Sequence, residues 1–225
     1  SGMHGEQTGR MLEGLEKVIH NERPDWVVVH GDTNSTLAGT LAAAKLKVPV
    51  AHVEAGLRSF NRAMPEEINR LVADQLATLL FTPTDTAVQN LVQEGISGER
   101  VREVGDVMYD AVLHFGERAL NESAVLERLQ LKEKGYLLAT IHRAENTDCP
   151  ECLRAIAEAL ESVHRELPVV WPMHPRTNKA LAEQALDPEV QIIDPVGYLD
   201  MQRLEQSAAV ILTDSGGIQK EACFH

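Results

Sequence analysis

Short apolar segments alternate with helical patterns along almost the whole chain, and this alternation constrains the fold more than any other feature. The apolar run at residues 26–29 reads as a buried strand, the Ala- and Leu-rich segment 35–46 as a helix, and residues 48–53 as the next strand. The loops between these segments are short. Repeated units of this kind predict an α/β fold, in which right-handed crossovers build doubly wound parallel sheets.

The same patterns locate the remaining elements. Strands are predicted at residues 26–29, 48–53, 79–81, 101–104, 136–140, 169–171, 191–193 and 210–213. Helices are predicted at residues 11–19, 35–46, 65–77, 86–93, 108–120, 150–167, 178–186, 199–207 and from 216 onward. The charged segment 121–135 has few strand-forming residues, and we interpret it as a helical connector at a domain boundary. The sequence therefore predicts two domains, 1–120 and 121–225.

Both predicted sheets look unfinished. The chain opens at Ser1 ahead of a helix and stops at His225, about two turns into a helix that a further strand ought to follow. We therefore expect the first domain to lack its first strands and the second domain to be truncated at its C-terminal end. A protein of only this length is expected to be inactive.

The acidic composition argues against two classes of partner. The 225 residues include 34 acidic side chains against 21 Lys or Arg, a formal net charge of −13. Nucleic acid is disfavoured, because its phosphates bind basic surfaces. No apolar run reaches the roughly 20 residues of a membrane span, so no membrane association is expected. An anionic ligand would instead bind to local positive features, such as helix N-termini or single arginines.

Cysteine usage favours a cytoplasmic location. Three cysteines in 225 residues do not make a disulfide framework. Cys149 and Cys152 form a C-x-x-C, but neither further zinc ligands nor a redox-type βαβ context accompanies them. We expect these two cysteines to be incidental residues at the start of the helix near 150–164.

Polar residues at strand exits are the first candidates for a site, because open parallel sheets bind ligands beyond the carboxyl ends of their strands. Asp32 follows the strand at 26–29, where it suits a general acid or base, although its position alone favours a helix cap. Glu54 directly follows the next strand, where burial suits a carboxyl group to proton transfer. The structural alternative for Glu54 is an ion pair with Arg58.

Two acids, Glu66 and Glu67, open the helix predicted at 65–77, directly after Pro65. Proline is favourable in a first turn, and the helix dipole favours acids there. The dipole accounts for one of the two acids, and the pattern alone does not say which one is left for function.

His142 and Arg143 follow the strand at 136–140 and combine a group that titrates near neutral pH with a permanent cation. A packed histidine is the structural alternative, and the position and the adjacent arginine make the two readings about equal. His174 is a further candidate at the exit of another strand. It lies in a proline-rich loop, and this weakens an assignment of function from its position.

The segment 210–219 is the most specific of these strand exits. Its strand ends where Gly216 and Gly217 begin a helix that Ser215 can cap. Without Cβ atoms, a pyrophosphate can approach the bare N–H groups at the positive end of that helix. Glu221 lies about one turn further along the same face, where its carboxylate can accept hydrogen bonds from ribose hydroxyls. Purely structural Gly-Gly turns also occur.

At these residues the sequence resembles the non-hydrolysing UDP-N-acetylglucosamine 2-epimerases. The matching stretches run in order along the whole chain, at residues 1–10, 30–33, 52–58, 64–70, 105–110, 142–146 and 213–219. The resemblance implies two Rossmann-like domains of the GT-B type, with the active site in the cleft between them. The domain at 121–225 would then bind UDP.

The resemblance also implies a role for each candidate residue. The catalytic positions of the family match Asp32, Glu54, Glu66 and His142. The substrate-binding positions match Ser215, Gly216 and Gly217 at the diphosphate, Glu221 at the ribose, Val196 and Met201 at the uracil, and Arg143 and His174 near a second, activating UDP-N-acetylglucosamine. The segment 59–64 is shorter here than in the members expected to have that second site.

The reaction implied by the resemblance interconverts UDP-N-acetylglucosamine and UDP-N-acetylmannosamine for polysaccharide biosynthesis. UDP is eliminated across C1–C2 to give 2-acetamidoglucal and is then added back with the C2 proton on the opposite face. The carboxylates supply the base, and Arg143 with the Gly216–Gly217 helix end stabilises the departing UDP. No metal or redox cofactor is needed, and a homodimer is expected. Which of Asp32, Glu54 and Glu66 removes the C2 proton stays open.

Three alternatives accompany this reading: a hydrolysing epimerase that releases UDP and free N-acetylmannosamine, a GT-B glycosyltransferase, and a non-catalytic nucleotide-sugar-binding module. The stretch 52–58 fits the non-hydrolysing group better than the hydrolysing one. Acids at two consecutive strand exits suit proton abstraction better than glycosyl transfer. The glycine-rich first strand-turn of the family, with its basic residues, is absent from this sequence.

Overall fold

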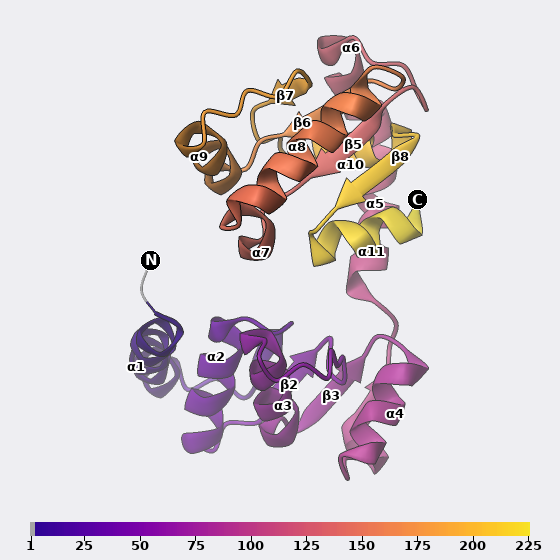
Figure 1. Cartoon of the computed structure of the whole chain (residues 1–225). Coiled ribbons are helices and arrows are strands. Elements are labelled where there is room, and N and C mark those ends of the chain that lie inside the picture. Colours follow the sequence, from indigo (N-terminus) through magenta and orange to yellow (C-terminus); the bar gives the residue numbers. More distant parts are fainter. Residues whose placement is uncertain (1–2) are drawn as a thin grey trace. The chain divides into compact units, whose positions relative to one another are not determined.

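The computed structural model describes residues 3–225, so Ser1 and Gly2 of the first matching stretch lie outside the described residues. The chain divides into two compact units, one ending at Val107 and the other covering Met108–His225 (Figure 1). Each unit is an α/β structure built on one parallel sheet. Among the described residues, no helix is long and apolar enough to cross a membrane.

The first unit alternates strands and helices. Its elements are α1 (His4–Glu22), β1 (Val27–His30), α2 (Asn34–Lys45), β2 (Val50–Val53), α3 (Pro65–Leu76), β3 (Leu79–Thr82), α4 (Asp85–Gln93), the 3₁₀ turn η1 (Gly98–Arg100) and β4 (Val101–Glu103). All strand pairs are parallel, in the order β1-β2-β3-β4. Because each strand is added on the same side of the preceding one, right-handed crossovers place α2, α3 and α4 on one face of the sheet.

The core of the first unit lies between this sheet and its helices. Buried apolar side chains from both layers form one cluster, which includes Ile19, Val29, Ala42, Ala43, Val50, Leu80, Leu91 and Ile96. The edge strand β1 alternates, with Val29 buried and Val28 57 % exposed. The sequence had suggested a strand that is buried throughout. The difference arises because an edge strand covered by helices on one face buries only every second side chain.

The second unit begins with α5 (Val107–Glu122), whose first residue belongs to the other unit. Its further elements are α6 (Val125–Leu129), β5 (Leu137–Thr140), α7 (Ala144–Thr147), α8 (Pro150–His164), β6 (Val169–Pro172), α9 (Pro175–Glu183), β7 (Gln191–Ile193), α10 (Tyr198–Ser207), β8 (Val210–Thr213) and α11 (Gly216–Phe224). The sheet is parallel and has the order β7-β6-β5-β8.

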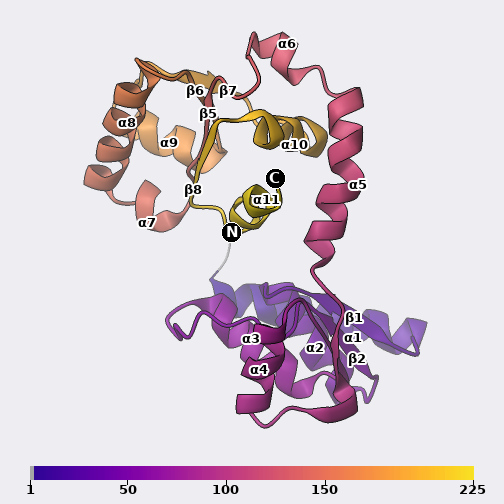
Figure 2. The ribbon, with the colours of Figure 1, turned by 90° about the vertical axis from the view of Figure 1, so that its right-hand side faces the viewer.

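This sheet is covered on both faces, as Figure 2 shows for the helices on either side of β5, β6 and β8. On one face, Leu137 and Ala139 of β5 pack with residues of α8 and α9, such as Leu153 and Leu181. The next residue of β5, Leu138, belongs to a second cluster on the other face, with residues of α6 and α10. The alternation along β5 therefore supplies both cores at once.

The strand order reverses next to β5. The chain proceeds from β5 through β6 to β7 on one side and then returns to place β8 on the other side of β5. Such a reversal is the topological switch point of a doubly wound sheet, where the loops that follow the two central strands diverge and leave room for a ligand. The segments that follow β5 and β8 are therefore the place to look for a site in this unit.

The predicted strands are confirmed within a few residues, and the prediction of parallel sheets is confirmed. Two helical predictions differ from the structure: α1 begins at His4 rather than near residue 11, and the short helix α7 was not predicted. Polar residues on the first turns of α1 hide its apolar periodicity, and α7 is a single turn without an amphipathic pattern.

Helix α5 lies with the second unit, so the division between the units precedes the boundary expected at residues 120–121. Its aromatic side chains pack on other elements of that unit. Phe115 meets Tyr198 edge to face at 5.5 Å, and Tyr109 lies 5.0 Å from Phe224 between ring centroids. Tyr109 and Tyr198 are themselves partly exposed, so these are aromatic contacts near the surface, and the sequence pattern of a connector does not reveal them.

Candidate functional site

The turn after β1 presents Asp32. Gly31 has φ = +61°, in the left-handed region that favours glycine, and it turns the chain toward α2. Asp32 does not cap α2, because the N-cap residue is Thr33 and its side chain makes no capping bond. Instead Arg70 of α3 donates from Nη2 and Nε to Asp32 Oδ2, at 2.6 and 3.0 Å. The helix-cap interpretation of Asp32 is therefore wrong.

The turn after β2 presents Glu54, which has a positive φ of +67°. A positive φ is uncommon for a residue with a side chain, and it directs the side chain out of the strand. A Cβ built on Gly31 would lie 3.4 Å from Glu54 Oε2, so the Glu54 carboxylate lies over the β1 turn. The exits of β1 and β2 thus bring Glu54 next to the residue that precedes Asp32.

The alternative of an ion pair between Glu54 and Arg58 is wrong. The Arg58 guanidinium donates to both oxygens of Glu94, at 2.7 and 2.6 Å, and its Nη1 lies 2.8 Å from Asp74 Oδ2. Arg58 is nearly inaccessible to solvent, with a side chain 1 % exposed. Its carboxylate partners raise the Arg58 pKa although burial alone lowers it.

The two acids at the start of α3 have different surroundings. Glu67 is buried and accepts hydrogen bonds from the N–H groups of Ser59 and Phe60, from Ser59 Oγ and from Arg70. Burial raises the Glu67 pKa, but these donors outweigh burial and lower it overall. The Glu66 side chain makes no hydrogen bond or ion pair with other described residues, and the residue is half-buried. Glu67 is therefore held by structural hydrogen bonds, whereas the Glu66 carboxylate is not.

In the second unit, Asp214 joins the two segments that leave the switch point. Its carboxylate follows β8 and accepts from the N–H groups of His142 and Arg143, which follow β5, and from Asn146 Nδ2. Burial raises the Asp214 pKa, but these hydrogen bonds and the nearby His142 outweigh it and lower the pKa overall. Asp214 lies within the stretch 213–219, but no role was predicted for it from the sequence. Its position directly after an apolar strand was the available signal.

His142 is oriented from two sides. Its Nδ1 lies 3.2 Å from Asp214 Oδ1, and its ring lies 5.3 Å from the ring of His174 between centroids. The His142 side chain is 37 % exposed, which leaves the ring accessible to a ligand. His174 is itself the N-cap residue of α9, where its Nδ1 accepts from Arg176 N–H at 3.2 Å.

The start of α11 has a geometry that suits an anion. Ser215 is the N-cap residue, and its Oγ accepts from Ile218 N–H at 3.4 Å, as the sequence predicted. The N–H groups of Gly216 and Gly217 have no acceptor among the described residues. A Cβ built on Gly216 would lie 3.7 Å from Arg143 Nη2, so this guanidinium lies beside the helix end. A cation and a helix N-terminus at one point favour a bound anion.

Glu221 lies one turn further along α11, where its carboxylate meets polar side chains of α10. Gln202 Nε2 donates to Glu221 Oε1 at 3.1 Å, and the Tyr198 hydroxyl also bonds this carboxylate. Burial raises the Glu221 pKa, and the bond from Tyr198 partly opposes that rise. Glu205, fully buried beside Gln202, has a pKa raised to about 8 by burial and by the Glu221 charge.

The two residues expected at the uracil lie at the start of α10. Val196 precedes this helix and Met201 lies in its first turns, where its N–H bonds the oxygen of Gly197. Both side chains are half-buried and pack at the margin of the core on that face of the sheet. They therefore present partly exposed apolar surface at the start of α10.

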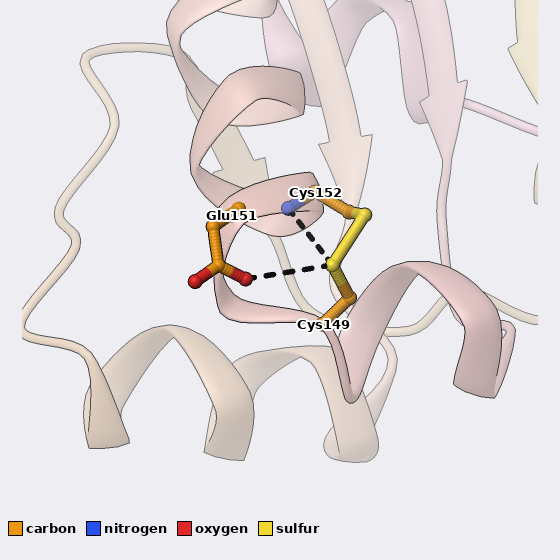
Figure 3. Close-up of a disulfide and its surroundings, with 3 residues drawn as sticks. All are labelled: Cys149, Glu151 and Cys152. Atoms are coloured by element: carbon orange, nitrogen blue, oxygen red, sulfur yellow. Dashed lines mark hydrogen bonds between the residues drawn. A yellow bond between two sulfur atoms is a disulfide. The ribbon is translucent and has the colours of Figure 1, made fainter.

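The C-x-x-C pair is bonded in the structure. Cys149 and Cys152 form a disulfide, with their Cα atoms 5.2 Å apart, and Figure 3 shows it at the start of α8. Cys149 is the N-cap residue, and its Sγ accepts from Cys152 N–H at 3.3 Å, while Glu151 Oε2 lies 3.7 Å from the same sulfur. The expectation of incidental, unlinked cysteines is wrong, because the first helical turn brings N-cap and third residue within bonding range.

The sequence-derived candidates thus fall into two groups. Asp32, Glu54 and Glu66 belong to the first unit, and the other candidates belong to the second. Sequence reasoning missed the residues that orient these groups, namely Arg70, Asp214, Tyr198 and Gln202. Arg70 and Gln202 lie on helices among ordinary surface-type residues, so only the fold reveals what they contact.

The fold and these strand exits define an α/β protein with two Rossmann-like units of the GT-B type, the class to which many nucleotide-sugar enzymes belong. A comparison with protein-family models supports a narrower statement. The chain belongs to the UDP-N-acetylglucosamine 2-epimerase family, whose model matches residues 1–225.

Individual relatives agree with this family. The chain is 53 % identical over 226 residues to the UDP-2,3-diacetamido-2,3-dideoxy-D-glucuronate 2-epimerase of Pseudomonas aeruginosa, covering 99 % of this chain and 62 % of that protein. It is 47 % identical to the UDP-N-acetylglucosamine 2-epimerase of Methanocaldococcus jannaschii, covering 100 % of this chain and 64 % of that protein. The chain therefore spans less than two thirds of the length of these relatives.

Solved structures show the same similarity. The Methanocaldococcus jannaschii UDP-GlcNAc 2-epimerase in complex with UDP-GlcNAc and UDP gives a TM-score of 0.90 at 47 % identity, covering 100 % of this chain and 64 % of that one. The Neisseria meningitidis UDP-GlcNAc 2-epimerase bound to UDP-GlcNAc gives 0.86 at 32 % identity, covering 98 % and 62 %. A trehalose-phosphate synthase from Burkholderia xenovorans, 14 % identical with a TM-score of 0.52, shares the fold alone.

Proposed function

We propose that the protein carrying this chain inverts C2 of a UDP-linked 2-acetamido sugar, interconverting UDP-N-acetylglucosamine and UDP-N-acetylmannosamine. The family match over residues 1–225 supports the reaction class. UDP binding is supported mainly by the start of α11. There Arg143 lies beside Gly216, and the N–H groups of Gly216 and Gly217 have no acceptor among the described residues. This arrangement suits a diphosphate.

The proposed reaction eliminates UDP across the C1–C2 bond. A base removes the C2 proton, the C1–O bond to UDP breaks, and 2-acetamidoglucal and UDP form. The UDP oxygen then adds back to C1 while a proton is delivered to the other face of C2. The α11 start and Arg143 stabilise the charge that develops on the departing UDP, which is a typical source of rate enhancement.

Two carboxylates are needed if each face of C2 has its own proton-transfer group. In the first unit, Asp32 is paired with Arg70, whereas Glu66 has no partner among the described residues. We assign proton transfer to the set Asp32, Glu54 and Glu66, and we give His142 a role at the leaving group, because Asp214 orients its ring.

In the second unit, the remaining candidates fit the nucleoside. The Glu221 carboxylate, held by Tyr198 and Gln202, is placed to accept hydrogen bonds from ribose hydroxyls. Val196 and Met201 supply the apolar surface and backbone for the base. We propose no metal or redox cofactor, because each step is a proton transfer or the departure of a stable anion.

A second substrate deserves equal testing. The Pseudomonas aeruginosa relative, whose name specifies UDP-2,3-diacetamido-2,3-dideoxy-D-glucuronate, is more similar in sequence than the M. jannaschii UDP-N-acetylglucosamine 2-epimerase. The two substrates share the UDP and the 2-acetamido group but differ at C3 and C6, so the same C2 chemistry serves either. Groups that contact C3 and C6 would decide between them.

The test is incubation of the protein in D₂O with each UDP-sugar in turn. Epimerisation gives the C2 epimer with deuterium at C2, and the substrate with the higher kcat/KM is the natural one. Replacing Glu54 with Gln is expected to lower kcat by about 10²- to 10⁴-fold while UDP still binds. The exposed Glu22 at the end of α1 supplies the matched control, Glu22→Gln.

Other products would identify the alternative functions. Free sugar in stoichiometry with UDP indicates a hydrolysing epimerase, and transfer to an added acceptor indicates a glycosyltransferase. UDP binding without turnover of either sugar, or turnover that Glu54→Gln leaves unchanged, contradicts the carboxylate mechanism proposed here.

We further propose a cytoplasmic homodimer in which UDP-N-acetylglucosamine can also act as an activator. The family resemblance supports the dimer, and the adjacent rings of His142 and His174 support a second ligand near Arg143. A low cysteine content supports the cytoplasm, while the Cys149–Cys152 disulfide is an observation against it. Sedimentation, substrate-saturation curves and cell fractionation test the three statements separately.

A further inference from the structure

A fully buried pair, His52 and Asp74, lies beneath the two turns that present Asp32 and Glu54. The side chains of both residues are 0 % exposed, and His52 Nδ1 lies 2.7 Å from Asp74 Oδ1. His52 belongs to β2 and Asp74 to α3. Polar groups at this depth are costly unless they are fully hydrogen-bonded, so their contacts define what they do.

On one side the pair holds the β1 turn. His52 Nε2 lies 2.8 Å from the carbonyl oxygen of Gly31. A carbonyl oxygen only accepts, so His52 Nε2 carries the proton and donates. Gly31 immediately precedes Asp32 and has the left-handed φ of +61°. The imidazole therefore fixes the peptide group that leads into Asp32.

On the other side the pair holds the β2 turn. Asp74 Oδ2 accepts from Gly56 N–H at 3.0 Å and lies 2.8 Å from Arg58 Nη1. Gly56 follows Glu54 by two residues and has φ = +81°. The Asp74 carboxylate thus fixes the backbone that leads out of Glu54, and it links this turn through His52 to the turn of Asp32.

These contacts distinguish the pair from ordinary core packing. Burying charged groups does not in itself make a core more stable, and apolar residues of similar volume often serve as well. Here the polar atoms of the pair meet the backbone of two functional turns and the Arg58 guanidinium rather than the rest of the core. If this pair aligns the two carboxylates, its role explains why His52 and Asp74 are polar although they are fully buried.

We propose that His52 and Asp74 are positioning residues for the C2 proton transfers, which set the placement of Asp32 relative to Glu54. This inference rests on the proposed function, since it names residues that act through its carboxylates. A misplacement of a catalytic group by about 1 Å can lower a rate by about 10²-fold. Substrate affinity, which the second unit is proposed to supply, should change little.

Two substitutions at His52 separate its two hydrogen bonds. The amide nitrogen of Gln reaches roughly the position of imidazole Nε2, so His52→Gln keeps a donor for the Gly31 oxygen. The shorter Asn reaches roughly the position of Nδ1, so His52→Asn keeps a partner for Asp74 and leaves the Gly31 oxygen without its donor. The exposed His20 at the end of α1 supplies matched controls, His20→Gln and His20→Asn.

The expected result is a difference between the two variants in kcat. His52→Asn should lower kcat by at least about 30-fold, with KM within about threefold of the parent, whereas His52→Gln should stay within about fivefold in both constants. Equal kcat values for His52→Gln and His52→Asn would overturn the proposal. So would a loss in both variants that follows their unfolding midpoints, because that pattern marks a merely structural role.

A measurement made without substrate tests this proposal independently of the proposed function. Amide hydrogen exchange should show Gly56 N–H exchanging at least about tenfold faster in Asp74→Ala, which removes its acceptor, and Gly31 N–H faster in His52→Asn than in His52→Gln. If the parent protein turns over neither UDP-sugar, the proposed function fails. The exchange of these two amides then still decides whether the pair anchors both turns, and unchanged exchange refutes it.

Discussion

Replacing the buried Glu205 with Gln should make the second unit more stable at neutral and alkaline pH. The Glu205 side chain is 0 % exposed, lies beside Gln202 and the Glu221 carboxylate, and has one oxygen without a hydrogen-bond partner among the described residues. Burial and the Glu221 charge raise the Glu205 pKa to about 8. His225 Nε2 lies 3.8 Å away, but burial lowers the His225 pKa, so it offers little positive charge.

The sign and size of the effect follow from proton linkage. In the unfolded chain Glu205 loses its proton near its ordinary pKa of about 4.5, whereas the folded protein retains it up to about pH 8. The stability that this proton contributes is therefore complete below about pH 4.5 and is lost as the pH rises toward 8. The slope is on the order of 1 kcal/mol per pH unit, so a few kcal/mol separate pH 5 from pH 8.

The assay is urea unfolding of the parent and of Glu205→Gln at several pH values from 5 to 9. Trp171 is fully buried in the second unit, so its fluorescence reports the unfolding of that unit once Trp26 of the first unit is replaced with Phe in both proteins. The difference in unfolding free energy between variant and parent should grow in favour of Gln as the pH rises. The exposed Glu117 of α5 provides the control Glu117→Gln. A difference that stays constant across the pH series would refute the reasoning.

Three further predictions follow from single positions. Gly56→Ala places a Cβ 2.4 Å from a backbone oxygen of α4, whereas Gly95 has a similar positive φ and open space around it. Thermal unfolding should therefore show that Gly56→Ala loses about 2 kcal/mol or more of unfolding free energy beyond the loss in Gly95→Ala. Equal losses in the two variants would show that the clash is relieved. Ser215→Ala and Thr84→Ala each remove a helix cap and should each cost about 1 kcal/mol of unfolding free energy. Only Ser215→Ala should also weaken UDP binding, measured by calorimetry. Unchanged UDP affinity in Ser215→Ala would contradict the diphosphate assignment. The Asp214 pKa is lowered in the folded state, so the stability that this carboxylate contributes is present above its ordinary pKa of 3.8 and is lost as the pH falls through the folded value. Asp214→Asn should therefore weaken the decrease of unfolding free energy at acidic pH. The same decrease in variant and parent would exclude this role.

The sequence by itself determined the architecture of this protein. Apolar runs that alternate with helical patterns leave few arrangements other than parallel sheets, because each short strand needs a helix to return the chain to the same end of the sheet. The same logic located the strand exits, and with them Asp32, Glu54, His142 and Ser215. The Ser215 cap could be predicted because a cap is a contact between residues close in sequence.

Tertiary structure decided which polar residues pair. Asp32 bonds Arg70, 38 residues away, and Arg58 bonds Glu94, 36 residues away, rather than the nearer partners that the sequence suggested. Helix α5 joined the second unit through aromatic contacts with α10 and α11, whose residues are still more distant in the chain: Phe115 meets Tyr198, 83 residues away, and Tyr109 meets Phe224, 115 residues away. Local sequence limits backbone conformation within a few residues, whereas an ion pair or a buried contact depends on which elements the folded sheet brings side by side.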